Sequence, residues 1–161
     1  MQRLSLLLFL SCFAGISCAP NKAALTLACD SIAEQMDACM DADRKFRQAC
    51  AEGDSMKIAE QLLLLERSAE RSLDKIRETE IDEDFSYIRE SGMNVPLTYC
   101  KLIESTYKPA LRSCGKADTN NCNSALRVAE KQLRYSIDLY NQKLDILVKE
   151  QHIITGAVYY H

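Results

Sequence analysis

The sequence predicts an all-α protein, a disulfide-stapled bundle of four to five helices. Apolar residues recur in steps of three and four over several long segments, which is the spacing of one helical face. Only five glycines and three prolines occur in 161 residues, and Gly53, Gly92 with Pro96, and Gly115 lie between the helix-like segments. Six cysteines follow the N-terminal segment, and an even number is typical of a disulfide framework.

The N-terminus has the composition of a secretory signal peptide. Arg3 precedes an apolar run over residues 4–13, which is too short to span a membrane, and small residues follow it. We place the cleavage after Cys18, so that residues 1–18 are the signal peptide and residues 19–161 form a single domain. The protein is therefore expected to be secreted and extracellular.

A cut one residue earlier would leave Cys18 at the mature N-terminus. The stretch "GISC" is similar to the bacterial lipobox, whose cysteine carries a diacylglycerol anchor, although Gly15 stands where that motif usually has Leu. A lipoprotein anchored through Cys18 is the resulting alternative. Cleavage after Cys18 is favoured because it leaves six cysteines instead of seven.

The length and net charge of the chain indicate how large its core can be and which classes of partner it is expected to bind. The mature chain of about 143 residues can bury roughly two thirds of its unfolded surface in one core. Removal of Arg3 takes the formal net charge from -3 to -4, and the chain has no Trp and no basic run. We therefore expect no nucleic-acid partner. No transmembrane segment is expected, because no run of 18 apolar residues follows the signal peptide.

The first helix is predicted from a stripe whose members alternate in steps of four and three. Asp43 is its only charged member, and three of its members are cysteines. The stripe consists of Leu25, Cys29, Ile32, Met36, Cys39, Asp43, Phe46 and Cys50. The three cysteines therefore lie on the face that should point into the core.

A second helix should begin near Asp54 or Ser55, either of which can cap it. Its outer face mixes acidic and basic residues, and the spacing predicts the ion pairs Arg67–Glu70 and Arg71–Asp74 on a solvated surface. Its apolar stripe consists of Ile58, Leu62, Leu65, Ala69, Leu73 and Ile76.

The next segment, residues 78–96, predicts a loop with a short helical piece around residues 85–89. A third helix should follow from about residue 97 to residue 113, with a kink at Pro109, because proline removes a backbone hydrogen bond. The last helix shows near-heptad spacing that is typical of coiled-coil packing. Its stripe consists of Leu126, Glu130, Leu133, Ile137, Tyr140, Leu144, Leu147, Gln151 and Ile154.

The cysteine spacing limits the disulfides. Residues eleven apart on a helix are separated by about 16 Å, whereas a disulfide needs Cα atoms within roughly 7 Å. Cys29, Cys39 and Cys50 therefore cannot bond one another. Their partners must be the remaining three cysteines, which are Cys100, Cys114 and Cys122.

The direction of the third helix decides between two sets of pairs. Antiparallel first and third helices predict a ladder of Cys50–Cys100, Cys39–Cys114 and Cys29–Cys122. Parallel helices, as in a simple up-down bundle, predict Cys39–Cys100 and Cys50–Cys114 and leave Cys29 far from Cys122. We favour the ladder because it pairs all six cysteines, and a local Cys114–Cys122 bridge is its main rival.

The motifs predict no catalytic site, cofactor or metal. The chain has only His152 and His161, both near the C-terminus, and neither is placed to support a nucleophile. No Cys-x2-Cys pair typical of zinc and no EF-hand pattern occurs. A non-enzymatic protein is therefore expected.

The expected function is a secreted binding or effector protein that contacts an unknown extracellular protein. Its contact is expected at a segment that combines carboxylates with aromatic rings, namely Asp82, Glu83, Asp84, Phe85 and Tyr87. The alternative is a carrier for a lipid or small apolar ligand, lined by Met36, Phe46, Tyr107, Leu111 and Tyr140.

Overall fold

The computed structural model describes residues 21–114 and 119–160, without the side chains of residues 113–114 and 119–123. The predicted signal peptide and Cys18 lie outside this description, and so do the side chains of Cys114 and Cys122. Every regular element in the described ranges is helical, which confirms the predicted all-α bundle.

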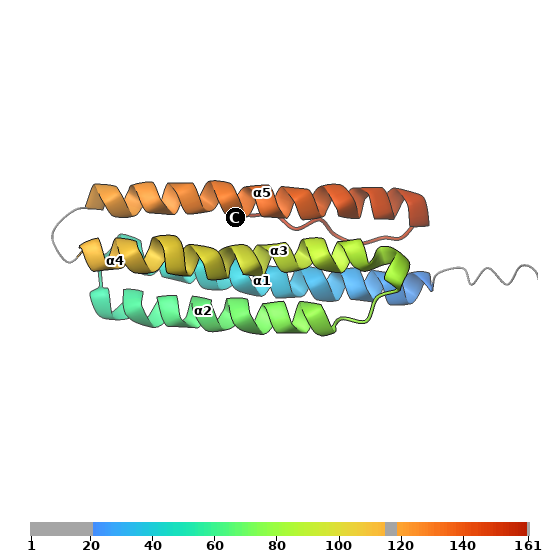
Figure 1. Ribbon diagram of the computed structural model, residues 1–161, viewed down its shortest axis with the longest axis horizontal. Coiled ribbons are helices and arrows are strands. Elements are labelled where there is room, and N and C mark those ends of the chain that lie inside the picture. The colour runs from blue at the N-terminus through green and yellow to red at the C-terminus, as the bar shows by residue number, and fades with distance from the viewer. Residues whose placement is uncertain (1–20, 115–118, 161) are drawn as a thin grey trace, which may run out of the picture.

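The helices form four antiparallel rods. They are α1 (Lys22–Glu52), α2 (Ser55–Glu78), α3 (Ser86–Leu102) continued by a π-helical turn (Ile103–Tyr107) and α4 (Lys108–Cys114), and α5 (Thr119–Gln151). Figure 1 shows that successive rods run in opposite directions, so α1 and the rod formed by α3 and α4 are parallel. The antiparallel arrangement on which the cysteine ladder depends is therefore wrong.

Helix α1 begins and ends with local signals in its sequence. The Asn21 side chain accepts a hydrogen bond from the Ala24 amide at 3.3 Å and caps the first turn. Gly53, with φ of 75°, ends the helix and donates its N–H to the Ala49 carbonyl. The predicted stripe is buried apart from Cys50, which is half-buried.

Helix α2 starts as predicted, because Asp54 accepts hydrogen bonds from the amides of Met56 and Lys57. The two ion pairs predicted on its outer face are wrong. Asp74 pairs instead with Arg77 at 2.9 Å, one turn towards the C-terminus. Neither Arg67 nor Arg71 has an ion pair with any residue in the described ranges.

The loop predicted over residues 78–96 is much shorter than expected. A single 3-10 turn (Glu83–Phe85) leads directly into α3, which continues through Gly92 and Pro96. Gly92 lies against α1, where an added Cβ would be 2.4 Å from Cγ2 of Ile32. The two residues that predict a break therefore lie in the helix, where burial of its face outweighs their low helical propensity.

A π-helical turn ends at Tyr107, two residues before Pro109, where the sequence predicts a kink. A proline inside a helix lacks an N–H and its ring crowds the carbonyl one turn back. The extra residue in a π-helical turn changes the register of the backbone hydrogen bonds at this point. The third rod is thus continuous from residue 86 to residue 114.

Helix α5 buries most of its predicted stripe, but Ile154 lies beyond the end of the helix and is 90% exposed. His152, with φ of 52°, occupies the left-handed region where the chain leaves α5. Residues 153–160, here called the C-terminal tail, then run back along the bundle (Figure 1).

The tail covers the side of the bundle between α1 and α5. Helix α1 packs most extensively against α2, and α3 packs against both α2 and α5, whereas the backbones of α1 and α5 hardly approach each other. Ile153 and Val158 of the tail are buried in the common core. No helix in the described ranges is long and apolar enough to cross a membrane.

Candidate functional site

The predicted contact segment lies at the corner where α2 turns into α3. Asp82, Glu83 and Asp84 are exposed, and the Asp82 side chain accepts a hydrogen bond from the Asp84 amide at 3.3 Å. Phe85 is half-buried and packs against the core. Tyr87 points elsewhere, because its ring lies 6.0 Å from Nζ of Lys143 on α5. The structure therefore separates Tyr87 from the other predicted residues.

Asp82 and Phe85 line a groove beside the first turn of α1, here called the corner groove. Its volume is about 340 Å³, and it is lined by Asn21, Ala24, Leu25, Glu80, Ile81, Asp82 and Phe85. The apolar side is formed by buried Leu25 with half-buried Ile81 and Phe85, and Glu80 and Asp82 are the exposed carboxylates. The first turn of α1 has no acidic residue of its own. Carboxylates near a helix N-terminus interact favourably with its dipole.

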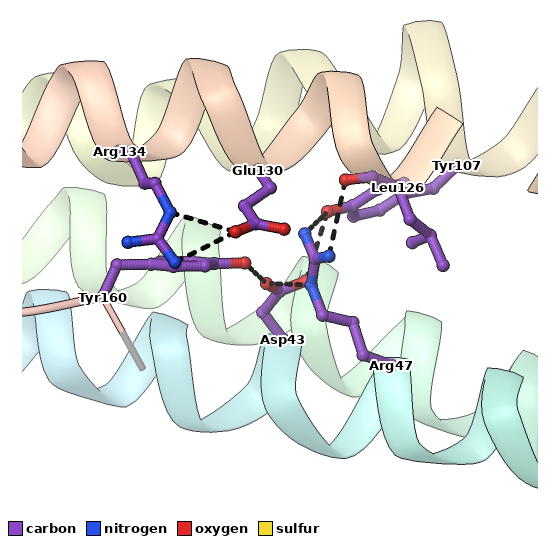
Figure 2. A network of polar contacts seen from close by, with 7 residues as sticks. All are labelled: Asp43, Arg47, Tyr107, Leu126, Glu130, Arg134 and Tyr160. Carbon is purple, nitrogen blue, oxygen red and sulfur yellow. Dashed lines mark hydrogen bonds and ion pairs between the residues drawn. The ribbon is translucent and has the colours of Figure 1, made fainter. Parts of the chain in front are cut away.

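A polar network under the tail surrounds Asp43 (Figure 2). The Asp43 carboxylate is 1% exposed and accepts hydrogen bonds from Arg47 Nε at 2.8 Å, Tyr107 Oη at 3.2 Å and Tyr160 Oη at 2.8 Å. Burial by itself would lower the pKa of Arg47, but the charge of Asp43 raises it above its ordinary value. Burial next to Asp43 raises the pKa of Tyr107 and Tyr160.

Cations from two helices flank the Tyr160 ring. The guanidinium of Arg134 lies 5.0 Å from the ring centroid and that of Arg47 lies 5.8 Å from it. Arg134 also pairs with Glu130 at 3.0 Å, and Arg47 donates to the Leu126 carbonyl at 3.4 Å. The network thus joins α1, the π-helical turn, α5 and the tail (Figure 2).

Two further contacts fasten the tail. The Asn141 side chain donates to the Val158 carbonyl at 2.6 Å and accepts from the Val158 amide at 3.0 Å. Thr155 donates to Asp30 at 2.7 Å. The sequence signal for this arrangement is the single carboxylate on the buried stripe of α1, because a buried carboxylate requires donors. The donors themselves, Tyr107 and Tyr160, were not predicted.

The four cysteines whose side chains the structure describes, Cys29, Cys39, Cys50 and Cys100, are free thiols, so the predicted disulfides are not seen among them. Cys39 is buried near α2, where its thiol donates to the Ser68 carbonyl at 3.9 Å. Burial raises the pKa of Cys39 to about 11, and the nearby Cys100 thiol adds to this increase. Because α1 and α3 run parallel, the pairing that the sequence predicts for this arrangement is Cys39 with Cys100.

The side chains expected to line a carrier cavity are part of the packed core. Met36, Phe46, Tyr107 and Tyr140 are almost fully buried, and Leu111 is half-buried. The rings of Phe46 and Tyr107 pack with their centroids 4.9 Å apart. The corner groove is lined by a different set of residues.

In the described ranges, no group of three His, Cys, Asp or Glu side chains is placed to hold a metal ion. Comparison with known proteins gives no relative: no family model, no curated protein and no solved structure matches this chain.

Proposed function

We propose that this chain is a secreted, non-enzymatic binding protein that contacts an extracellular protein partner through the corner groove. The observation that carries the proposal is the pairing of exposed carboxylates, Glu80 and Asp82, with the apolar surface of Leu25, Ile81 and Phe85. Such a surface suits a partner segment that places a Lys or Arg beside an apolar side chain. The carboxylates steer the cation, and the apolar contact contributes the buried area.

Packing favours this function over that of a carrier. A carrier needs space between its helices, whereas the core side chains on the facing helices of this bundle are in van der Waals contact. Gly92 illustrates how tightly they pack, because α3 approaches Ile32 too closely to admit a single methyl group. An apolar ligand would have to displace packed rings such as those of Phe46 and Tyr107.

Disulfides belong to the proposed secreted form. The parallel course of α1 and α3 supports two bridges, one from Cys39 to Cys100 and one from Cys50 to Cys114, and the electrostatic influence of Cys100 on the pKa of Cys39 is consistent with the first. Each bridge forms when two thiols lose two electrons and two protons to a disulfide oxidant of the secretory pathway. Each should contribute on the order of 2–4 kcal/mol to stability.

The binding proposal is tested with a library of fluorescent hexapeptides that combine Lys or Arg with apolar residues. The double variant Glu80→Gln/Asp82→Asn removes two charges, and Asn at position 82 retains the ability to cap the turn. We expect the peptides that bind the wild type to lose about tenfold in affinity for this variant.

The matched control is Asp41→Asn/Asp145→Asn, which removes two exposed carboxylates that pair within their own helices. Peptides selected on the wild type should bind this control unchanged. Equal losses in both variants, or the absence of any binding peptide, would contradict a role for the corner groove.

Secretion is tested separately by expressing the full chain in a secreting host. N-terminal sequencing and intact mass of the recovered protein should show a chain that begins at Ala19. A diacylglycerol mass on Cys18 would instead support the lipoprotein alternative.

A further inference from the structure

A row of cations lines a second groove, between α1 and α2, here called the α1–α2 groove. Arg67, Arg71 and Lys75 recur every fourth residue of α2, so they follow one another at about 6 Å along the helix. All three are exposed, and none of the three side chains has an ion pair or hydrogen bond with another residue of the described ranges. Three cations without partners therefore face one groove of about 340 Å³.

The opposite wall of the groove carries an amide side chain that is free to take a ligand. The side chain of Gln35 on α1 lines the same groove and is only 8% exposed. Within the part of the chain that the structure describes, no group hydrogen-bonds to its amide. The amide therefore offers donors and an acceptor to a polar ligand in the groove.

We propose that the α1–α2 groove binds a linear sulfated carbohydrate. Sulfate esters spaced along a sugar chain would meet Arg67, Arg71 and Lys75 in turn. The Gln35 amide and the exposed Glu34 carboxylate, which also lines the groove, offer a donor and acceptors for sugar hydroxyl groups. The volume lies at the lower end of the range for small-molecule sites.

The composition of the groove disfavours nucleic acid and polyphosphate. No aromatic side chain lines it, so the bases of a single strand would have no ring on which to stack. Inorganic polyphosphate has no hydroxyl groups along its chain that could donate to the Glu34 carboxylate, whereas a sulfated sugar presents hydroxyl groups beside its sulfates. A ligand that alternates sulfates with hydroxyls fits both walls. This inference does not depend on the corner groove.

Isothermal titration calorimetry of the full-length mature chain tests the proposal. The probes are a heparin-derived tetrasaccharide, the same tetrasaccharide after desulfation, and inorganic polyphosphate, each at roughly 50 and 200 mM salt. We expect the sulfated tetrasaccharide to bind more tightly than the other two. Absence of its binding, or polyphosphate bound as tightly, overturns the proposal.

Two variants separate charge from hydrogen bonding. Arg67→Gln/Arg71→Gln should weaken binding of the sulfated tetrasaccharide by about tenfold or more, and it should reduce the slope of log affinity against log salt by about 2. Gln35→Leu should weaken binding several-fold with the slope unchanged, because it removes an amide and no charge. Circular dichroism verifies that both variants fold.

The control Arg77→Gln/Lys149→Gln removes the same number of charges from exposed cations that pair within their own helices. It should bind the tetrasaccharide as the wild type does. An equal loss in this control would mean that net charge alone governs binding, which overturns the assignment to the groove.

Discussion

The hydroxyl of Tyr160 lies 2.8 Å from Oδ2 of Asp43, so the last residue of the described chain is hydrogen-bonded to the middle of α1. The two residues are 117 positions apart in the sequence. Tyr160 is the last residue of the C-terminal tail. This tail lies between α1 and α5, two helices whose backbones hardly approach each other. The tail therefore completes the bundle on this side, and its contacts should contribute to stability.

Replacement of Tyr160 by Phe should cost about 1 kcal/mol of unfolding free energy. The change removes the hydrogen bond from Tyr160 to Asp43, and a single hydrogen bond typically contributes about 1 kcal/mol to stability. The ring remains between Arg47 and Arg134. Urea unfolding followed by circular dichroism measures it. The control Tyr159→Phe, on a side chain that is 66% exposed, should leave the midpoint unchanged. Equal midpoints for all three proteins would show that the Tyr160 hydroxyl contributes nothing.

Replacement of Asp43 by Asn should be more damaging, at about 3 kcal/mol. The variant keeps the shape of the side chain but leaves Arg47, whose side chain is 23% exposed, without its counter-charge. It also weakens the acceptor for two tyrosine hydroxyls. Urea unfolding tests this, with Asp41→Asn as a control whose ion pair is exposed. A loss no greater than that of the control would rule out a structural role for the buried charge.

The parts of the fold that depend on local signals were predictable from the sequence. Asp54 caps α2, and the stripe of α1 is buried as its spacing indicates. The antiparallel course of the first and third helices is wrong because it depends on a long loop over residues 78–96, most of which is helical in the structure. The connection between α2 and α3 is short, and a short connection makes the two helices that it joins antiparallel. Because α1 and α2 are also antiparallel, α1 and α3 are parallel.

The sites depend on contacts between distant segments, which helical periodicity does not encode. The sequence predicts Asp82 and Phe85 as contact residues. Leu25 forms the opposite wall of the corner groove, and it does so only because α1 packs beside these two residues in the fold. In the same way, the sequence predicts that Arg67 and Arg71 lie on a solvated, ion-paired face. Without knowledge of the opposite wall, nothing in the spacing indicates that these cations line a groove.

Gly92→Ala should destabilise the protein even though alanine is the better helix former. The new Cβ would lie 2.4 Å from Cγ2 of Ile32, and overpacking of this kind costs typically about 1–3 kcal/mol. The gain in helical propensity, about 1 kcal/mol, offsets only part of this. Thermal unfolding measures the net change. Gly156→Ala, where the added Cβ has no neighbour within 4 Å, is the control. A higher midpoint for Gly92→Ala would mean that α3 can move away from α1 at little cost.

The fully reduced protein should lose stability as the pH rises from about 9 to about 11. Burial raises the pKa of Cys29, Cys39 and Cys50 from 9.0 to about 11. The folded state therefore prefers the protonated thiols, and the unfolded chain gains stability once its own thiols ionise above pH 9. The stabilising effect is fully present below pH 9 and is lost as the pH passes through 11. Urea unfolding of the reduced protein at several pH values measures the change.

The matched control for this pH effect is the double variant Cys39→Ser/Cys100→Ser, which lacks both thiols of the proposed bridge. Its loss of stability between pH 9 and 11 should be smaller than that of the reduced wild type, because serine does not ionise in this range. Oxidised wild type should behave like the variant if the Cys39–Cys100 bridge has formed, since a disulfide has no thiol proton to lose. The bridge would be contradicted if the oxidised wild type lost as much stability between pH 9 and 11 as the reduced protein does, and if both thiols could still be alkylated after unfolding.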